Sequence, residues 1–504
     1  EDEKKSQPIW VTPNASTQKL QEKMFVDFQN DVKVADIKLS VLEGYESVEH
    51  VKRYTTLGMA TDQGKLSNLN GLKILADTIG RRVDEVGTTT FRPPFTPISM
   101  GSIAGEATGH LFKATRKTAI DEWNSANGGQ WEQVGDWRRV YAYLRSGETV
   151  REAVNREVLN TRKRVGLLDA STLGKILVSG PDAGAFLDLI YTNTMSNMKV
   201  GKCRYGLMCN ENGFLFDDGV VVRLSESTFL CHTTTGGSDR VYSWMEEWLQ
   251  TEWWTLNVFT FNLTEQYAQI GIAGPKAKQL LETVLDKEGA VSDLSFMSFM
   301  RTKYKNVGLN IFRISFSGEL SYEVAVPTKH ALTFWNDCIK LGEKFGIQPY
   351  GTEALHVMRA EKGFIMIGDE TDGTVIPQDL NLNWAVSKKK KDFLGKRAHS
   401  RVYMRAEDRK QLVGLLTDNP AFVLPDGAHA IEKSEERASA NIIGHVTSSY
   451  FSPTLGRSIA LGLISGGADR LGEKLDFSLD DGNVERAKIV KPVFYDPTGE
   501  KQNE

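Results

Sequence analysis

The sequence has few cysteines, almost no excess of charge of either sign and no long apolar run. Its four cysteines among 504 residues, Cys203, Cys209, Cys231 and Cys338, form no Cys-x-x-Cys pair, so no disulfide framework or zinc spacing is offered. Lysine and arginine number 61 against 65 acidic residues, a net charge of −4 that argues against nucleic-acid binding through a basic field. No stretch approaches the roughly 18 consecutive apolar residues of a membrane span. We expect a cytoplasmic protein with neither nucleic acid nor membrane as partner.

The composition is that of an ordinary globular protein, 40% hydrophobic and 25% charged. The chain is long enough for about three domains. Residues 1–22 are polar and begin with Glu1 rather than methionine, which suggests a linker or a processed end. Residues 23–83 alternate helical patterns with turns and predict a small helical module. Residues 84–148 carry turn signals with little periodicity, and we expect a loop-rich connecting segment.

Residues 149–400 alternate helix and strand patterns, which makes the fold class α+β. A helix at 149–166 opens with a capping box of Thr149 and Glu152, and residues 204–224 predict a β-hairpin around Asn212-Gly213. The order of elements at 175–250 recurs at 267–345, so we expect an internal pseudo-repeat. Residues 405–497 contain short β-rich runs at regular spacing, typical of a small antiparallel barrel or sandwich.

The predicted hairpin carries the first candidate site, Asp217 and Asp218 with Tyr205 on the opposite strand. Strand alternation places the two carboxylates on opposite faces, so one can point inward while its neighbour points to solvent. An inward carboxylate beside Tyr205 would be poised against a ligand nitrogen. The alternative is an exposed acidic pair near a turn.

The second candidate is Glu323, which lies between apolar residues in a core-like run, SFSGELSYEVAVP at 315–327. A buried carboxylate needs a partner, either a planar ligand that presents two nitrogen donors or an arginine. On the helix at 351–363, His356, Arg359 and Glu361 can be ordinary surface residues. The sequence shows no catalytic triad, phosphate loop, metal site or dinucleotide-binding fingerprint.

Several blocks together resemble a known family. CRYGLMCNENGFLFDDGVVV, AGPKA and TSSYFSPTLGRSIAL resemble the aminomethyltransferases, the family of the glycine cleavage T-protein. KRYTTLGMATDQGK, TTTFRPPF, HTTTGG, RAEKGFIMIGDETDGT and DLNLNWAV are closer to the C-terminal half of the α-subunit of heterotetrameric sarcosine oxidases. The resemblance covers nearly the whole chain. It implies three subdomains around a central folate cavity, the last of them a C-terminal β-barrel.

Site residues follow from this resemblance position by position. It implies folate contacts at Tyr205, Asp218, Thr233, Glu323 and Trp384. Asp218 matches the aspartate that faces the folate N10 region and is the expected catalytic residue, and Glu323 matches the glutamate that holds the pterin amino group and ring NH. Thr233 replaces a usual asparagine of T-proteins and Leu355 a usual arginine, so the T-protein reaction itself is in doubt and a different one-carbon donor is implied.

The N-terminal module is similar to a bacterioferritin-associated ferredoxin-like [2Fe–2S] domain. The positions of the four ligand cysteines hold Asp27, Gln29, Asp62 and Ser67, and no cysteine precedes Cys203. Since such a cluster needs thiolates, we expect a helical scaffold without an iron–sulfur cluster, serving as a docking surface. No metal site is expected.

The activity that the resemblance implies is capture of a one-carbon unit. In sarcosine oxidases of this type a flavoprotein partner oxidises an N-methyl amine, and tetrahydrofolate traps the iminium carbon as 5,10-methylenetetrahydrofolate. The expected partners are a β-subunit-like oxidase containing FAD and FMN, small subunits, and an N-terminal dinucleotide-binding half of the α-subunit. That half is not in this sequence, so the isolated chain should not oxidise amines. Which N-methyl amine is oxidised stays open.

An FMN shared with the partner is a further expectation. Residues with the chemistry to hold its phosphate are Lys52, Arg53, Thr55, Lys65, Thr89 and Arg92. A solvated basic face is the alternative. Two other functions stay open for the whole chain, namely a stand-alone tetrahydrofolate-dependent aminomethyl- or methyltransferase, and a non-catalytic folate-fold scaffold of a flavin complex.

Overall fold

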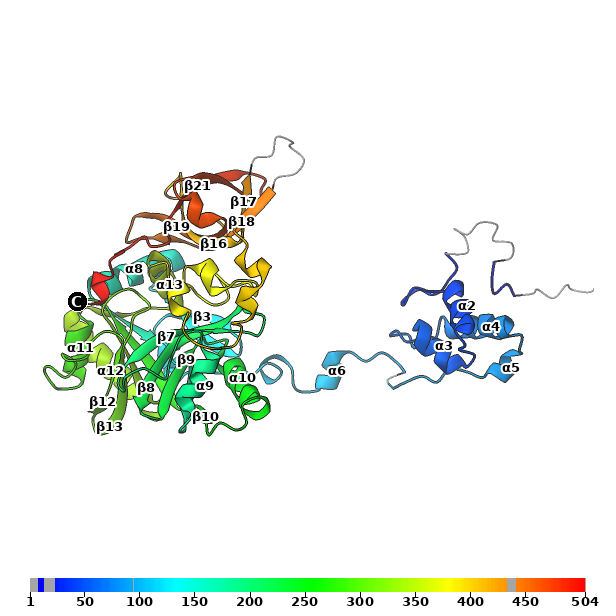
Figure 1. Ribbon diagram of the computed structural model, residues 1–504, viewed down its shortest axis with the longest axis horizontal. Helices are drawn as coiled ribbons and strands as arrows, with labels where there is room; N and C mark the ends of the chain where they lie inside the picture. The colour runs from blue at the N-terminus through cyan, green and yellow to red at the C-terminus, as the bar shows by residue number, and fades with distance from the viewer. Residues whose placement is uncertain (1–7, 13–22, 94, 433–440, 504) are drawn as a thin grey trace, which may run out of the picture. The chain divides into compact units, whose positions relative to one another are not determined.

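The computed structural model describes residues 8–12, 23–93, 95–432 and 441–503 (Figure 1). They form two compact units, one within Glu1–Ala114 and one within Thr115–Glu504. Of the linker expected at 1–22, all but residues 8–12 lies outside the described residues. Among the helices described, none is long and apolar enough to cross a membrane.

The first unit is a small helical module, as the sequence predicted. A short antiparallel pair, β1 (Phe25–Asp27) and β2 (Val32–Lys33), leads into the helices α2 (Val34–Leu42), α3 (Val48–Thr55), α4 (Asn68–Ile79) and α5 (Val83–Val86). The apolar faces of these helices bury one core that includes Ile37, Val51 and Leu75. The helix α4 ends at Gly80, whose positive φ of 67° suits glycine. The short helices α6 (Met100–Ala104) and η1 (Gly109–Leu111) follow.

The segment expected to be loop-rich carries more regular structure than its pattern indicated. Helix α7 (Asp121–Ala126) and a hairpin of β3 (Gly129–Val134) and β4 (Trp137–Tyr143) belong to the second unit. Arg138 binds Asp121 at 2.6 Å, and the Tyr143 hydroxyl donates to Asn124. The alternating aromatic residues Trp131, Trp137 and Tyr141 were the available strand signal.

Two mainly antiparallel sheets form the centre of the second unit. The five-stranded sheet has the order β10 (Phe259–Asn262), β6 (Gly174–Ser179), β9 (Thr228–Thr233), β8 (Leu215–Ser225), β7 (Cys203–Cys209). The six-stranded sheet has the order β12 (Ser298–Tyr304), β13 (Val307–Arg313), β14 (Ser321–Pro327), β11 (Tyr267–Ala273), β5 (Val165–Asp169), β15 (Ile347–Pro349). Apart from the extra strand β15, the second order is the first in reverse with equivalent strands in equivalent places, so the predicted pseudo-repeat is confirmed.

Each sheet buries one face under helices and turns the other toward its counterpart. Helices α9 (Ala183–Ile190) and α10 (Ser238–Thr251) cover the five-stranded sheet, and α11 (Ala277–Val284) and α12 (Ala331–Gly342) cover the six-stranded one. Between the sheets, Val222 and Leu230 of one pack with Phe312 and Ala325 of the other. This inner layer is where opposite sheets bring their side chains together.

The C-terminal strands close into the predicted barrel. Its order is β16 (Lys410–Thr417), β19 (Arg457–Ser465), β18 (Asn441–Ser452), β17 (His429–Glu432), β20 (Lys474–Ser478), β21 (Val484–Val490), with β21 pairing back onto β16. In Figure 1 the barrel, drawn in orange and red, lies over α8 (Val150–Lys163) and α13 (Thr352–Glu361). The predicted capping box is present at the start of α8, where Thr149 accepts from the Glu152 amide. The remaining short helices of the unit are η2 (Thr328–His330), η3 (Glu343–Phe345), η4 (Pro377–Leu380), η5 (Asn383–Ala385), η6 (Ala398–Ser400), η7 (Val402–Arg405), η8 (Gly467–Arg470) and η9 (Glu500–Gln502).

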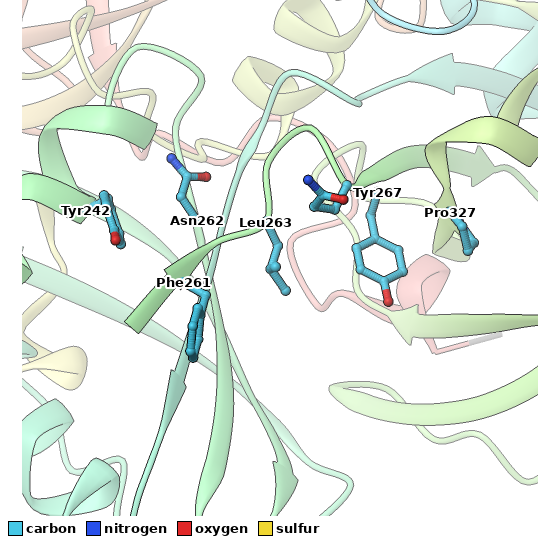
Figure 2. A pocket seen from close by; sticks show the side chains of 7 residues that line it. Tyr242, Phe261, Asn262, Leu263, Tyr267 and Pro327 are labelled. Atoms are coloured by element: carbon cyan, nitrogen blue, oxygen red, sulfur yellow. The ribbon is translucent and has the colours of Figure 1, made fainter. Parts of the chain in front are cut away.

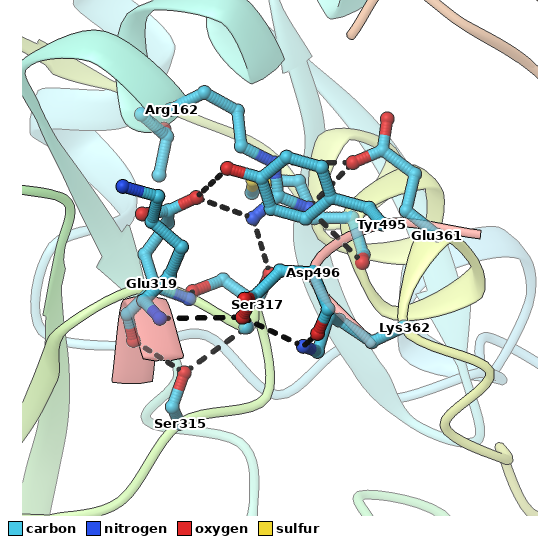
Figure 3. A network of polar contacts seen from close by, with 12 residues as sticks. Arg162, Ser315, Ser317, Glu319, Glu361, Lys362, Tyr495 and Asp496 are labelled. Carbon is cyan, nitrogen blue, oxygen red and sulfur yellow. Dashed lines mark hydrogen bonds and ion pairs between the residues drawn. The ribbon is translucent and has the colours of Figure 1, made fainter. Parts of the chain in front are cut away.

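A buried ion-pair network fastens these parts together (Figure 3). The Arg162 guanidinium on α8 binds Glu319 at 2.9 Å and Glu361 of α13. Tyr495, in the segment after the barrel, donates to Glu319, and Ser452 of β18 donates to Glu361. The network therefore holds two helices, a loop, the barrel and the C-terminal segment in one arrangement.

The expectation that α13 carries ordinary surface residues is wrong. Arg359 and Glu361 are fully buried, and His356 is 9% exposed. Arg359 binds Glu370 at 2.8 Å and Ser448 of the barrel at 2.7 Å. Alternation and composition of one helix gave no sign of the barrel that covers it.

Candidate folate site

The register of the strands places the polar residues of the site in the inner layer between the two sheets. In the five-stranded sheet Tyr205 pairs with Val220, Leu207 with Asp218, and Lys175 with His232. Residues two apart on a strand share a face, so Asp218 lies on the same face as Val220 and Val222, which turns toward the six-stranded sheet. In that second sheet Glu323 shares its face with Ala325, which packs in the same layer. The two carboxylates thus belong to facing surfaces.

Asp218 and Tyr205 form a pair, as the sequence analysis anticipated. The Tyr205 hydroxyl donates to Asp218 Oδ2 at 2.5 Å. Burial raises the pKa of Asp218 to about 7, the neighbouring Asp217 charge adds to the rise, and the Tyr205 hydrogen bond opposes it. A carboxylate with this pKa can both take up and release a proton near neutrality.

Asp217 takes a different place from the one expected. It lies on the opposite face, as alternation predicted, but it is fully buried rather than in solvent. Its side chain accepts from the amides of Asp218 and Thr234 and from the Thr234 hydroxyl at 3.1 Å. Helix α10 begins just beyond Thr234 and covers this face, so a second buried carboxylate replaces the exposed one.

Glu323 has an amide as its partner, not an arginine. Gln269 of β11 donates to Glu323 Oε2 at 2.7 Å. Burial raises the pKa of Glu323, while the Gln269 hydrogen bond and the Lys175 charge lower it. Directly across from Glu323, register places Gly271. The carboxylate therefore borders a place on the sheet that carries no side chain.

Sequence reasoning missed Lys175, His232 and Gln269. Lys175 is 1% exposed, and its ammonium donates to the carbonyls of Ser171 and Leu173. Burial lowers the pKa of Lys175 to about 7 and that of His232 to about 4. A lysine inside the apolar run KILVS and a glutamine inside YAQIGIA were the available signals, since polar residues within core strands need a reason.

Two predicted folate contacts lie at the margin of this group. Thr233 ends β9 opposite Gly174, and its hydroxyl donates to the Thr234 carbonyl at 3.1 Å. Trp384 is 69% exposed, and its ring centroid lies 5.8 Å from that of Tyr205. Trp384 is therefore placed beside the Tyr205–Asp218 pair, whereas Thr233 lies on the other face from His232.

The residues expected near FMN gather in the first unit. Lys52 donates to the Thr90 carbonyl at 2.5 Å, and Lys65 donates to the Phe95 carbonyl at 2.9 Å. Thr55 donates to Val51 within its own helix, and Arg53 and Arg92 are exposed. The partly buried Thr89 precedes Thr90, whose amide donates to Glu49 of α3. One face thus combines α3, Lys65, residues 89–93 and Phe95, although both lysines donate to carbonyls.

The four positions matched to cluster ligands also lie together. Asp27 is 2% exposed and accepts from the Gly58 amide at 2.8 Å and the Ser67 hydroxyl at 3.5 Å. The Gln29 side chain accepts from the Asp62 amide at 3.3 Å. Hydrogen bonds among oxygen-bearing side chains and backbone amides join the loops here. In the described part of the chain no group of three His, Cys, Asp or Glu residues could hold a metal ion.

A hollow of about 630 Å³ lies apart from the predicted residues (Figure 2). It lies among α10, β10 and the start of β11. Its lining consists of Tyr242, Phe261, Asn262, Leu263, Gln266, Tyr267 and Pro327. None of the predicted folate contacts lines it.

Comparison with known proteins identifies the family of this fold. Residues 120–390 match the GCVT N-terminal domain, and residues 410–496 match the glycine cleavage T-protein C-terminal barrel domain. An aminomethyltransferase from Thermotoga petrophila is 31% identical over 75% of this chain and 98% of its own. The chain belongs to the aminomethyltransferase family. The crystal structure of glycine cleavage system aminomethyltransferase T from Bartonella henselae, 24% identical, covers 76% of this chain and 99% of its own with a TM-score of 0.67, which confirms the fold.

The N-terminal module distinguishes this member of the family. Residues 21–106 match the sarcosine oxidase A3 domain. Sarcosine oxidase subunit alpha of Corynebacterium sp. (strain U-96) is 44% identical over 99% of this chain and 52% of its own length. This chain thus spans about half the length of the sarcosine oxidase subunits that it resembles.

Proposed function

We propose that this chain is the folate-binding, one-carbon-transferring part of a sarcosine oxidase-type complex. Oxidation of an N-methyl amine on a flavoprotein partner yields an iminium, and its carbon is captured on tetrahydrofolate as 5,10-methylenetetrahydrofolate. The observation that carries the proposal is the Tyr205–Asp218 pair on one sheet and Glu323 on the sheet that faces it. This reaction needs two groups from the protein, namely an acid–base group and an acceptor of hydrogen bonds from the ring nitrogens.

The residues present fit a folate ring. Glu323 is an acceptor suited to the adjacent amino group and ring NH of a pterin. Gly271 opposite it has no side chain, and a Cβ there would lie 3.4 Å from that of Leu168. Gly271 therefore leaves a place without a side chain between Glu323 and Leu168, which suits one face of a planar heterocycle.

Asp218 is the residue to which we assign the proton transfer. Tetrahydrofolate as acceptor substrate supplies two amine nitrogens, N5 and N10, that together hold one carbon. Asp218 takes the proton that N10 gives up when its bond to that carbon forms, and the Tyr205 hydroxyl holds the carboxylate in place. A preorganised group of this kind commonly contributes about 10²–10³ in rate. The inner layer between the sheets also keeps the reactive carbon from water.

The partners in this proposal are those that the resemblance to sarcosine oxidase α-subunits implies, and this chain spans about half the length of those subunits. We assign to the complex an N-terminal dinucleotide-binding half of an α-subunit, a β-subunit-like oxidase containing FAD and FMN, and small subunits, all in the cytoplasm. The first unit of this chain would serve as a docking surface without an iron–sulfur cluster. Its exposed Arg53 and Arg92, with Lys52, Thr55, Lys65 and Thr89 nearby, would face the FMN phosphate.

An Arg92→Glu variant tests the FMN assignment in the assembled complex. We expect a lower FMN content per complex with unchanged FAD, because a carboxylate would repel the phosphate. The matched control is Arg145→Glu, another exposed arginine, which lies in the second unit. Unchanged FMN content in the Arg92 variant would contradict the assignment.

The function itself is tested on the complex purified from its host through a tag on this chain. We expect flavin to co-purify and sarcosine oxidation to yield 5,10-methylenetetrahydrofolate when tetrahydrofolate is added, and free formaldehyde when it is not. Tetrahydrofolate binding without any flavoprotein would favour the stand-alone transferase. The match over 98% of the length of an aminomethyltransferase supports that alternative. Absence of tetrahydrofolate binding would leave only the alternative of a non-catalytic scaffold in a flavin complex.

A further inference from the structure

Gln269 presents a buried acceptor that nothing in the described structure satisfies. The side chain is fully buried on β11, and its Oε1 has no hydrogen-bond partner among the described residues. An orphaned buried acceptor costs about 1–3 kcal/mol, so such groups normally have a partner. This one lies beside the carboxylate that the proposed function assigns to the folate ring.

Two acceptors fix the orientation of the Gln269 amide. Its Nε2 donates to Glu323 Oε2 at 2.7 Å and lies 3.5 Å from His232 Nε2. The other ring nitrogen of His232 donates to the Val220 carbonyl at 3.0 Å, which leaves Nε2 as an acceptor. With the NH₂ group turned toward both, the amide oxygen must face the other way. A rotated amide would set oxygen against two acceptors.

We propose that Gln269 determines specificity for reduced folates by accepting a hydrogen bond from N8–H of the pterin ring. This inference rests on the proposed function, because it assumes that a folate ring lies against Glu323. Glu323 takes the amino group and the adjacent ring NH. On the other side of the amino group lies N1, which has a lone pair, and the next donor after N1 is N8–H. The Gln269 NH₂ group lies between the Glu323 carboxylate and the Gln269 oxygen, just as N1 lies between the amino group and N8–H.

The oxidation state of the pterin ring decides whether N8 carries the hydrogen that Gln269 Oε1 would accept. Tetrahydrofolate and 7,8-dihydrofolate both carry hydrogen on N8. Folic acid carries a lone pair there, which would face the lone pairs of Gln269 Oε1. Sites built around a hydrogen bond reject ligands that lack its partner far better than sites that rely on shape. His232 acts as a positioning residue, since it holds the amide in the selective orientation.

Calorimetric titration of the full chain with these three ligands tests the inference. For the wild type we expect similar dissociation constants for tetrahydrofolate and dihydrofolate, and one about 100-fold higher for folic acid. In Gln269→Met, which keeps the length but neither accepts nor repels, the folic acid constant should come within about five-fold of the others. Gln279→Met, an exposed position on α11, is the matched control and should keep the wild-type ratio.

The ratio separates this role from a structural one. If Gln269 only supports packing, the variant should weaken all three ligands equally, and an unchanged ratio would overturn the inference while leaving the proposed function intact. His232→Leu should shift the ratio in the same direction but less, and it replaces the first variant if Gln269→Met does not fold. A wild-type chain that binds none of the three ligands would contradict both proposals.

Discussion

A cross-strand pair at the centre of each sheet distinguishes the two halves of the central unit. Strands β6 and β11 both run into a Gly-Pro turn, at Gly180 and Gly274, and these glycines have similar φ angles of 132° and 121°. Aligned on that turn, Leu177 of the first half corresponds to Gly271 of the second. Leu177 pairs with Leu230, whereas Gly271 pairs with Glu323. The same scaffold pairs two leucines in one half and places a carboxylate beside a glycine in the other.

The neighbouring polar position diverges in the same way. Lys175 and Gln269 are equivalent, and both are buried. Lys175 binds two carbonyls of its own loop, while Gln269 reaches across to Glu323. In the proposed folate site the first half therefore contributes a structural cation and the acid–base pair, and the second half contributes the acceptors. The proposed site needs both halves, because its two carboxylates lie on sheets that face each other.

Glu323→Leu removes the difference between the halves and should have the largest effect. It gives β14 the residue type that β9 has at Leu230. We expect the tetrahydrofolate dissociation constant to rise on the order of 10³-fold, because two hydrogen bonds to a charged acceptor are lost. The melting temperature should stay the same or rise, since a buried carboxylate is removed. Glu343→Leu, an exposed position, is the control for calorimetry, and retained binding in Glu323→Leu would contradict the comparison.

The substitution Asp218→Asn should show that the two adjacent carboxylates of the first half have different roles. We expect formation of 5,10-methylenetetrahydrofolate by the purified complex to slow about 10²–10³-fold with folate binding retained. Asp217→Asn is the matched control. It disturbs three hydrogen bonds, one from the Asp218 amide and two from Thr234, and should lower the melting temperature while changing the rate less than about five-fold. The opposite pattern would reverse the assigned roles.

The pH dependence of the reaction should report Asp218. Because its pKa is raised to about 7, kcat/KM for transfer should fall about ten-fold per pH unit below 7 and level off above it. The folded state binds this proton more tightly than the unfolded state, so the stabilisation is complete below the ordinary carboxyl pKa and is lost as the pH rises toward 7. The melting temperature of Asp218→Asn minus that of the wild type should therefore increase as the pH rises from about 4 to about 7. A constant difference across this range would count against the raised pKa.

Trp384→Ala should have the smallest effect of the set. The ring is largely exposed, and its centroid lies 5.8 Å from that of Tyr205. We expect the tetrahydrofolate dissociation constant to rise about three- to ten-fold, the value of one aromatic contact. Trp254→Ala, at another exposed tryptophan, should leave it unchanged. Equal effects of both variants would remove Trp384 from the site.

Local patterns predicted the elements that depend on neighbours in the chain. The hairpin around Asn212-Gly213, the capping box at Thr149 and the C-terminal barrel are all present, because turn chemistry, caps and alternation act over a few residues. The Tyr205–Asp218 pair follows from the same hairpin register. Family resemblance then supplied Glu323, which alternation alone marked only as a buried carboxylate.

Contacts between elements far apart in sequence escaped prediction. Gln269 and His232 approach across two sheets, and neither strand indicates the other. Asp217 and Arg359 were misjudged for the same reason, since α10 covers one and the barrel the other. Burial by a distant element leaves no mark on the local pattern, whereas a polar residue inside an apolar strand does. That signal, at Lys175 and Gln269, was visible but unassigned.

Calorimetric titration of the full-length chain with tetrahydrofolate, without any partner, tests the central claim most directly. If the facing sheets form a folate site, one molecule should bind per chain with a micromolar dissociation constant, and Glu323→Leu should abolish the heat. Absence of binding to the wild-type chain, or binding that Glu323→Leu leaves unchanged, would contradict it.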